Sequence, residues 1–322
     1  MLIVTNYAAL PARWRTASGI EGETVQARTL AEFKAHGARK DAVFVISGDA
    51  HTVIQLVLAR RFLSGFARPI VAIDLIFRRP STLKSRVSHL LKRPFLSGAD
   101  LYINFFADAR GLSEIYGIPP ERCAYVPFKV NLDLDAAARA ERTEEFVLTF
   151  GRSMRDFDTF FAAMERLPYP GAIARVNPES LVAHGARFTR PLDKLPANVA
   201  QLDDDGSTHA QLDMLRRAKL VVIPVVKSSF VASGISTALN AMILGKCVIG
   251  SEGPGMTDIF ADEIIAVPPE DPAALAAAIA RAWTDDSLRQ RTAEAGLRCA
   301  EHLGGEAQLA QRLIDRIALT YG

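Results

Sequence analysis

The stretch that decides the fold is VASGISTALNAMILGKCVIGSEGPGMTDIF, residues 231–260. A loop containing Ser233 and Gly234 leads into a helical segment at 235–245, and an apolar run at 246–251 follows it. This order of loop, helix and buried strand is typical of parallel α/β sheets. The first N–H groups of a helix are unpaired and its dipole favours an anion, so small residues at this helix start indicate a phosphate-binding loop. An ordinary strand–loop–helix connection is the alternative interpretation.

Outward from this stretch, apolar runs alternate with helical segments along the whole chain. The expected strands are 2–6, 42–47, 69–76, 100–105, 123–128, 146–151, 171–176, 198–203, 219–226, 246–251 and 263–269. The expected helices are 24–37, 50–65, 156–167, 209–218, 235–245 and a helical tail from 271 onward. Continuous apolar strands separated by helices indicate βαβ units and therefore parallel sheets.

The alternation of strands and helices is interrupted once, by the polar and charged segment 129–145. A chain of 322 residues is long enough for about two domains. The sequence therefore predicts an α/β protein of two Rossmann-like domains facing across a cleft, with a C-terminal helical tail. We place the domains at 1–142 and 143–322, and we expect ligands beyond the carboxyl ends of the strands.

The charge distribution and the cysteines bear on the partners and the compartment to expect. Residues 1–142 contain 20 Lys and Arg against 13 Asp and Glu, so the first half is basic, while the remainder contains 18 against 23 and is acidic. The three cysteines, Cys123, Cys247 and Cys299, form no CxxC pair, which favours a reducing compartment and argues against structural zinc. The N-terminal residues lack the basic region of a signal peptide, and no apolar run reaches 18 residues. We therefore expect a cytoplasmic protein.

A second candidate loop follows the first strand of the second domain, in FGRSMRD at 150–156. Gly151 and Arg152 come directly after the strand, and Arg155 follows three residues later. A guanidinium group can bind a diphosphate with two parallel hydrogen bonds.

The third loop is SEGPGMTD at 251–258, where Gly253 and Gly255, next to Met256, make room for a flat or bulky group of a ligand. Three loops at the ends of strands in one sheet favour a phosphate ligand over an ordinary connection. The chain contains neither GxxxxGK[ST] nor a GxGxxG after its first strand, which argues against a P-loop NTPase and a dinucleotide oxidoreductase.

Taken in order, these elements resemble the donor-binding domain of GT-B-fold glycosyltransferases, in the large retaining group called family 4 (glycosyl transferases group 1). The resemblance is carried by TFGRSMRDFDTFFAAM, AKLVVIPVV, SGISTALNAMILGKCVIGSEGPGMTDIF and VPPEDPAALAAAIARAWTD. It covers residues 146–322, and the segment 98–131 resembles the closing part of the family's acceptor domain.

The resemblance implies a nucleotide diphosphosugar as donor and gives each loop a role. Gly151 and Arg152 match the glycine–arginine pair at the diphosphate, and Arg155 stands in for the family's lysine. The remaining donor-binding candidates lie in the other two loops and in the helix after residue 234; they are Ser233, Gly234, Ile235, Asn240, Gly253, Gly255 and Met256.

The chain departs from the family at two positions. The family's two glutamates, eight residues apart, align with Ala232 and Asn240. Asn240 can still donate and accept hydrogen bonds at a ribose, without charge, whereas Ala232 cannot replace a glutamate. The retaining mechanism of the family depends mainly on stabilising the leaving diphosphate, so the resemblance implies a metal-independent hexosyltransferase with no cofactor. The alternative is a catalytically impaired relative that acts as a partner or regulator of an active transferase.

An acidic run in the second domain raises the question of a metal site. Asp203 and Asp205 form a DxD sequence, which we interpret as a solvated turn and not as a metal site.

The first domain contains two candidate catalytic residues. Asp74 interrupts an apolar strand, where a carboxylate needs a partner or a function. His51 follows a strand end beside Asp49, which we interpret as a helix N-cap. Asp74 and His51 are the catalytic candidates on the acceptor side.

The segment 75–99 contains six Lys and Arg and no acidic residue, interleaved with Leu, Val and Phe. This mixture suits a helix on an anionic membrane surface, through residues 75–95, or beside a lipid diphosphate acceptor. A solvated basic helix is the alternative, and the near-neutral whole chain argues against nucleic acid. We therefore expect transfer of a hexose to a glycan or lipid-linked saccharide in polysaccharide or glycoconjugate biosynthesis, in the cytoplasm or at the inner face of a membrane.

Overall fold

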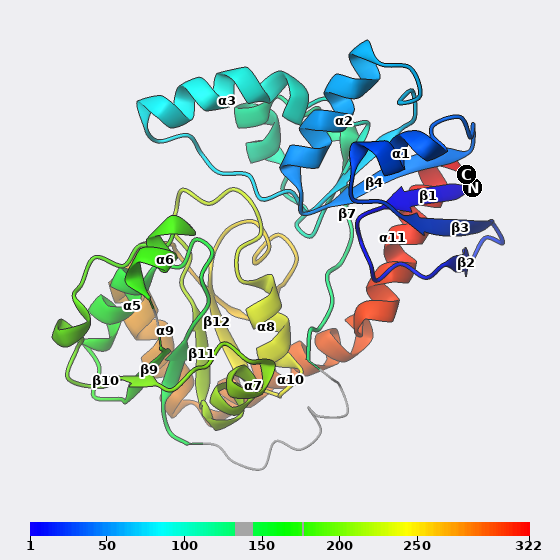
Figure 1. The fold of residues 1–322 in the computed structure, drawn as a ribbon. Helices are drawn as coiled ribbons and strands as arrows, with labels where there is room; N and C mark the ends of the chain where they lie inside the picture. The colour runs from blue at the N-terminus through cyan, green and yellow to red at the C-terminus, as the bar shows by residue number, and fades with distance from the viewer. Residues whose placement is uncertain (133–143, 176) are drawn as a thin grey trace. The chain divides into compact units, whose positions relative to one another are not determined.

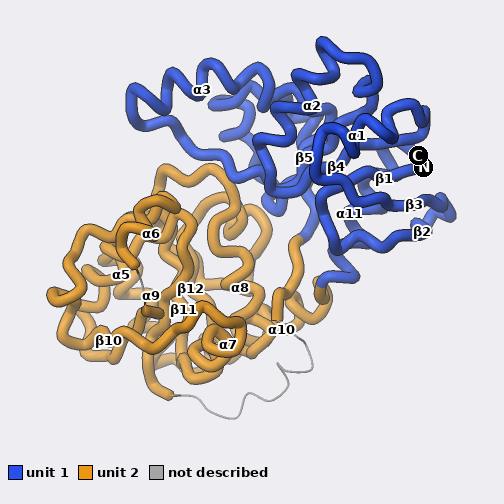
Figure 2. The backbone as a smooth tube through the Cα atoms, viewed as in Figure 1, with its two compact units in different colours: residues 1–127, 306–322 blue, residues 128–305 orange. Residues whose placement is uncertain are grey.

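The computed structural model describes residues 1–132, 144–175 and 177–322. These residues form two compact units (Figures 1 and 2), of which unit 1 holds 1–127 with 306–322 and unit 2 holds 128–305. The expected boundary at 142/143 lies outside the described residues. The division differs from the expected one in two places, because residues 128–132 belong to unit 2 and residues 306–322 belong to unit 1. No helix among the described residues is both long and apolar enough to cross a bilayer.

Unit 1 is built on a seven-stranded sheet in the order β2-β3-β1-β4-β5-β6-β7, in which only β2 is antiparallel. The strands are β1 (Leu2–Thr5), β2 (Arg13–Arg15), β3 (Glu21–Gln26), β4 (Ala42–Ser47), β5 (Ile70–Ile73), β6 (Leu101–Asn104) and β7 (Cys123–Tyr125). The direction of strand addition reverses between β1 and β4, which makes their carboxyl ends the expected place for a ligand.

The helical elements of unit 1 connect and cover these strands (Figure 1). They are α1 (Leu30–His36), α2 (Ala50–Phe62), α3 (Leu83–Leu96), a short π-helix (Leu112–Tyr116), a 3₁₀ turn (Pro120–Arg122) and the C-terminal α11 (Glu306–Tyr321). The helix predicted at 24–37 is wrong over its first residues. Residues 23–26 pair with β1 as part of a strand, and the helix begins only after Thr29, whose side chain caps it together with Glu32.

Unit 2 has a six-stranded parallel sheet in the order β10-β9-β8-β11-β12-β13. The strands are β8 (Val147–Thr149), β9 (Gly171–Ala174), β10 (Val199–Leu202), β11 (Leu220–Ile223), β12 (Cys247–Ser251) and β13 (Ile265–Val267). Numbered within the unit, this order is 3-2-1-4-5-6, the Rossmann arrangement. Its switch point lies between β8 and β11.

The helices of unit 2 are α5 (Phe157–Met164), α6 (Pro178–Ala183), α7 (Thr208–Arg217), α8 (Ile235–Met242), α9 (Pro272–Thr284) and α10 (Asp286–Leu303), with a 3₁₀ turn at Leu192–Lys194. Phe157, Phe160 and Phe161 of α5 are fully buried against one sheet face, together with α9. At about 25 cal/mol per Å² of buried apolar surface, this cluster is a main source of the unit's stability.

Candidate functional site

The loops after β8 and β11 are joined at the switch point of unit 2. The N–H of Val226 donates to the carbonyl of Met154 (3.0 Å), and the N–H of Asp156 donates to the carbonyl of Pro224 (2.9 Å). These backbone bonds fix the loop that holds Gly151 and Arg155 beside the loop that leads into α8. The structure thus brings together two of the three loops that the sequence singled out.

Arg155 is buried at the centre of this arrangement, with 2% of its surface exposed. Its Nε donates to the carbonyl of Phe150 (2.9 Å), and its Nη2 lies 3.4 Å from Oγ1 of Thr237 in the first turn of α8. Among the described residues, Nη1 has no hydrogen-bond partner. Burial lowers the pKa of Arg155 to about 10, so the group keeps its charge at neutral pH.

The neighbouring carboxylate does not neutralise this charge. Asp156 is fully buried, caps α5 through the N–H of Thr159 (3.1 Å), and accepts hydrogen bonds from Nε and Nη2 of Arg187 (2.8 and 2.5 Å). A buried cation without a counter-charge is costly, and such groups are usually paired. Arg155 is therefore a cation positioned for an anion that the chain itself does not supply.

Two glycines make room for the Arg155 guanidinium. A Cβ on Gly151 would lie 2.5 Å from Nη2, and one on Gly234 would lie 2.7 Å from Nη1. Gly234 has a φ of 99° and precedes α8, whose N-terminus has no side-chain cap. The unpaired N–H groups of that helix start therefore lie above a buried positive charge, an arrangement that favours a phosphate.

The other predicted donor residues take varied places in unit 2. Arg152 is exposed, whereas Ser233 is buried with its hydroxyl 3.2 Å from that of Ser229. Ile235 is buried at the first position of α8. Met256 is buried too, and its thioether packs against Gly250, so its side chain contributes to the core.

The third loop meets the second at Ala232. A Cβ on Gly255 would lie 2.6 Å from Cβ of Ala232, so the two loops are in close contact at this point. The N–H of Gly253 donates to Thr257 (3.1 Å), and the N–H of Gly255 donates to Asp258 (2.6 Å). All three loops predicted from the sequence therefore lie at the same edge of the sheet.

Asn240 already has a partner. Its Oδ1 accepts a hydrogen bond from the N–H of Asn131 (2.9 Å), and the Asn131 amide bonds to Ser236 on the same helix. Asn240 is also buried, with 7% of its surface exposed. Part of its hydrogen-bonding capacity therefore holds the segment that enters unit 2 against α8.

Beside these loops lies a pocket of about 400 Å³ that the sequence did not reveal. Phe150, Gly151 and Arg152 form one side of it. Residues from the end of β9 onward and from the segment after β10 complete it; they are Ala174, Arg175, Asn177, Ser180, Leu181, Asp204, Asp205, Gly206 and Gln211. Its size and its mixture of polar and apolar groups suit a small organic ligand.

The acidic run at its rim forms a turn. Asp203 pairs with Arg175, Asp204 accepts from the N–H of Gly206 (2.8 Å), and Asp205 accepts from the N–H of Ser207 (2.8 Å). No group of three or more metal-ligating side chains gathers in the part of the chain that the structure describes.

The acceptor-side candidates lie at the carboxyl ends of β4 and β5 in unit 1. Asp49 caps α2, accepting from the N–H groups of His51 (3.0 Å) and Thr52 (3.1 Å). Burial alone would raise the pKa of Asp49, but these bonds and the Thr52 hydroxyl outweigh it and lower the pKa. Among the described residues, no hydrogen bond or ion pair joins His51, which is exposed, to Asp74.

Asp74 is the more unusual residue of the two. It lies just after β5, in the left-handed region with a φ of 49°, although it is not a glycine. Among the described residues its carboxylate forms no hydrogen bond, and burial raises its pKa to about 6. Strained backbone and a desolvated acid at a strand end are features that cluster at functional sites.

We expect the Asp74→Asn variant to show a pH-dependent gain in stability. The pKa of Asp74 is raised in the folded state, so its contribution is fully present below the unfolded pKa near 4 and is lost as pH rises through about 6. The variant should therefore gain about 2–3 kcal/mol over wild type at pH 8 relative to pH 4. Urea unfolding of both proteins at the two pH values measures this difference. An equal difference at both values would show that Asp74 has an ordinary pKa.

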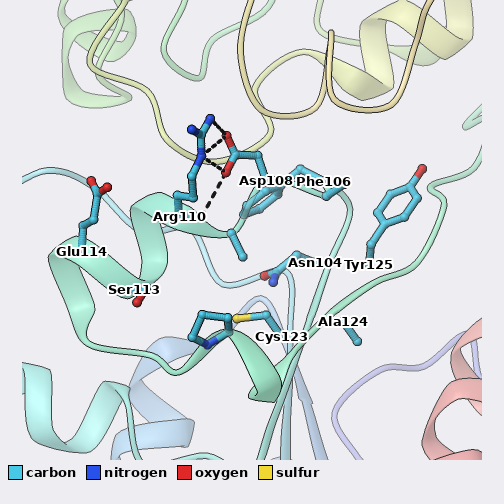
Figure 3. Close-up of a pocket in the computed structure, with 12 residues that line it drawn as sticks. Asn104, Phe106, Asp108, Arg110, Ser113, Glu114, Cys123, Ala124 and Tyr125 are labelled. Atoms are coloured by element: carbon cyan, nitrogen blue, oxygen red, sulfur yellow. Dashed lines mark hydrogen bonds and ion pairs between the residues drawn. The ribbon is translucent and has the colours of Figure 1, made fainter.

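A second pocket, of about 430 Å³, lies in unit 1 at the ends of β6 and β7. Figure 3 shows Arg110 paired with Asp108 on one side of this pocket (2.6 Å), with Glu114 and Ser113 nearby and Cys123 opposite. Burial raises the pKa of Cys123, so the thiol is protonated at neutral pH. This site could not be found from the sequence, because its polar residues are dispersed over three elements.

Each unit is an α/β unit with a largely parallel sheet, and unit 2 has the Rossmann strand order. The GT-B fold of the solved structures below consists of two such units. Residues 205–298 match the family model described as Glycosyl transferases group 1. The resemblance that the sequence motifs indicated is thereby confirmed over this segment of unit 2.

Solved structures share the fold over nearly the whole chain. Sucrose-phosphate synthase from Thermosynechococcus elongatus is 18% identical, with a TM-score of 0.65 over 100% of this chain and 88% of that one. Anabaena HepE, solved with UDP and glucose, is 11% identical, with a TM-score of 0.64 over 92% and 86%. A UDP-forming α,α-trehalose-phosphate synthase from Burkholderia vietnamiensis is 15% identical, with a TM-score of 0.63 over 100% and 99%. No curated protein matches the chain in sequence.

Proposed function

We propose that this protein is a glycosyltransferase that moves a hexose from a nucleotide diphosphosugar to a glycan or lipid-linked saccharide. The observation that carries the proposal is the buried Arg155 cation, unpaired at Nη1, beneath Gly234 and the uncapped start of α8. A diphosphate is an anion of suitable charge for that position. The match to group 1 glycosyltransferases and the UDP in the HepE structure support the same ligand class.

In this proposal each part of unit 2 has a task. The pocket of about 400 Å³ beside Gly151 receives the nucleoside, and the diphosphate lies at the start of α8. Arg155 and the helix N–H groups stabilise the negative charge that develops on the leaving diphosphate. Fixed protein charges of this kind act without a metal or cofactor, and we propose that the reaction retains the anomeric configuration.

Unit 1 would hold the acceptor. Asp74 has a carboxylate with a pKa near 6 and no hydrogen-bond partner among the described residues, so it can accept a hydrogen bond from an acceptor hydroxyl. His51 at the start of α2 and the pocket beside Arg110 and Glu114 offer further polar contacts.

A second candidate function is that of a catalytically impaired relative that binds a partner transferase. Two observations favour it. Ala232 offers no carboxylate and is in close contact with the Gly255 loop, and Asn240 uses its Oδ1 to bind the backbone of Asn131. Both positions align with glutamates in the family that the sequence resembles.

Thermal denaturation in the presence of nucleotides distinguishes the two candidates. We expect one of UDP, GDP, ADP and TDP, or its hexose conjugate, to raise the melting temperature at millimolar concentration. A ligand at 100 times its Kd adds about 2.7 kcal/mol, which shifts a domain of this size by several degrees. Adenosine serves as a control that lacks the diphosphate. No shift with any diphosphate would favour the impaired relative over the active enzyme.

A further inference from the structure

Helix α3 in unit 1 exposes apolar side chains that a surface helix normally buries. Leu83, Val87, Leu90 and Leu91 are 80%, 53%, 69% and 68% exposed. At 3.6 residues per turn these four positions share one stripe about 100° wide, which we call the α3 outer face. A contiguous exposed apolar stripe marks an interaction surface more often than a solvated one.

The opposite side of α3 attaches the helix to unit 1. Leu96 is buried, and Nε2 of His89 lies 3.0 Å from the carbonyl of Ile115. The His89 ring also packs edge-on against Tyr116, with ring centroids 4.7 Å apart. Because these contacts fix the rotation of the helix, the outer face cannot turn inward without breaking them. The hydrophobic pattern of α3 is therefore directed away from the core of its own unit.

Positive charge borders this apolar stripe. Lys84, Arg86, Lys92 and Arg93 are exposed, and none forms an ion pair with another described residue. On a helical projection Arg86 and Arg93 lie along one border of the stripe and Lys84 lies along the other, whereas Lys92 lies on the opposite side of the helix. No acidic residue occurs between positions 75 and 99.

We propose that the α3 outer face lies in the surface of an anionic lipid bilayer. The leucines would enter the acyl boundary, and the lysine and arginine side chains would reach the phosphate groups of the lipids. The charge pattern favours a bilayer over a protein partner, because three unpaired cations on the two borders of an apolar stripe match a continuous anionic surface. This inference does not depend on the donor site, which lies in the other unit.

Co-sedimentation with lipid vesicles tests the proposal. The whole protein is mixed with vesicles of phosphatidylcholine alone or with about one third phosphatidylglycerol. We expect binding to the anionic vesicles, at least tenfold weaker binding to the neutral ones, and weakening by salt, since each basic residue near the surface adds attraction. Equal binding to both vesicles, or none to either, would overturn the proposal.

A matched pair of substitutions locates the surface. Leu90→Glu on α3 and Leu319→Glu on α11 each place a carboxylate at an exposed leucine, 69% and 76% exposed. We expect Leu90→Glu to weaken binding to anionic vesicles at least tenfold and Leu319→Glu to leave it unchanged, with both melting temperatures close to that of wild type. Equal effects of the two would contradict the assignment to α3.

Two further measurements separate this proposal from its alternatives. Lys84→Glu with Arg86→Glu should weaken vesicle binding while the nucleotide-induced thermal shift stays as in wild type, so failure here and failure of the donor site are distinguishable. Sedimentation velocity without lipid should give a monomer. A dimer that Leu90→Glu dissociates, in a protein that ignores vesicles, would show that a second copy covers the α3 outer face.

Discussion

Replacing Arg155 with methionine is expected to abolish most donor binding without unfolding the protein. Methionine fills a similar volume but removes the buried cation and its unpaired Nη1. Loss of one preorganised charge at a developing oxyanion typically lowers turnover about 100- to 1,000-fold, or roughly 3–4 kcal/mol. Removing a buried cation that has no counter-charge should also relieve a desolvation cost, so we expect the free energy of unfolding to rise. Activity and stability should therefore move in opposite directions.

Urea unfolding and turnover of the nucleotide sugar identified by thermal shift measure the two effects. The control is Arg152→Met, which removes an exposed arginine from the same loop. We expect it to lower turnover less than Arg155→Met, because an exposed charge is screened by water. A large loss of stability in Arg155→Met, with turnover per folded molecule unchanged, would show that Arg155 has a structural role only.

Alanine at position 234 is expected to destabilise the protein strongly. Gly234 has a φ of 99°, and a Cβ there would lie 2.5 Å from Cγ2 of Ile223 and 2.7 Å from the Arg155 guanidinium. The left-handed conformation costs about 1–2 kcal/mol and overpacking a further 1–3 kcal/mol. We expect a total loss near 3 kcal/mol, measured by urea unfolding.

Gly206→Ala is the matched control for this prediction. Gly206 has a φ of 80°, but a Cβ there would meet nothing within 4 Å. The two variants share the backbone strain and differ in steric contact, so their difference isolates the contact with Ile223 and Arg155. We expect Gly206→Ala to lose about 1 kcal/mol. Equal losses would mean that the loop before α8 moves freely and does not press on Arg155.

The sequence identified the sheets because parallel strands covered on both faces are continuous apolar runs. The segments 219–226 and 246–251 are runs of this kind, and they form β11 and β12. Strand β3 was missed because its sequence, EGETVQ, lies near the edge of the sheet and contains no buried residue. The pairing with β1 gives this segment its strand conformation, and that pairing cannot be read from local pattern.

The three loops of the donor site follow directly from the ends of predicted strands, so Gly151, Arg155 and Gly234 could be grouped from the sequence. The other features of the site depend on contacts between residues far apart in the sequence, which the sequence does not reveal. The contact of Arg155 with Thr237 joins residues 82 positions apart. The pairing of Asp156 with Arg187, which leaves Arg155 without a counter-charge, likewise depends on tertiary packing. The amphipathic pattern of α11 predicts a helix but does not tell which unit it covers.

Calorimetric titration with a nucleoside diphosphate tests the central claim most directly, because it asks whether Arg155 and the start of α8 hold an anion. The claim predicts saturable binding of one nucleotide per chain to the wild-type protein, weakened about 100-fold or more in Arg155→Met, with Leu319→Glu on α11 close to wild type. Equal affinity of wild type and Arg155→Met would place the nucleotide elsewhere, and the absence of binding in the wild type would contradict a donor site in unit 2.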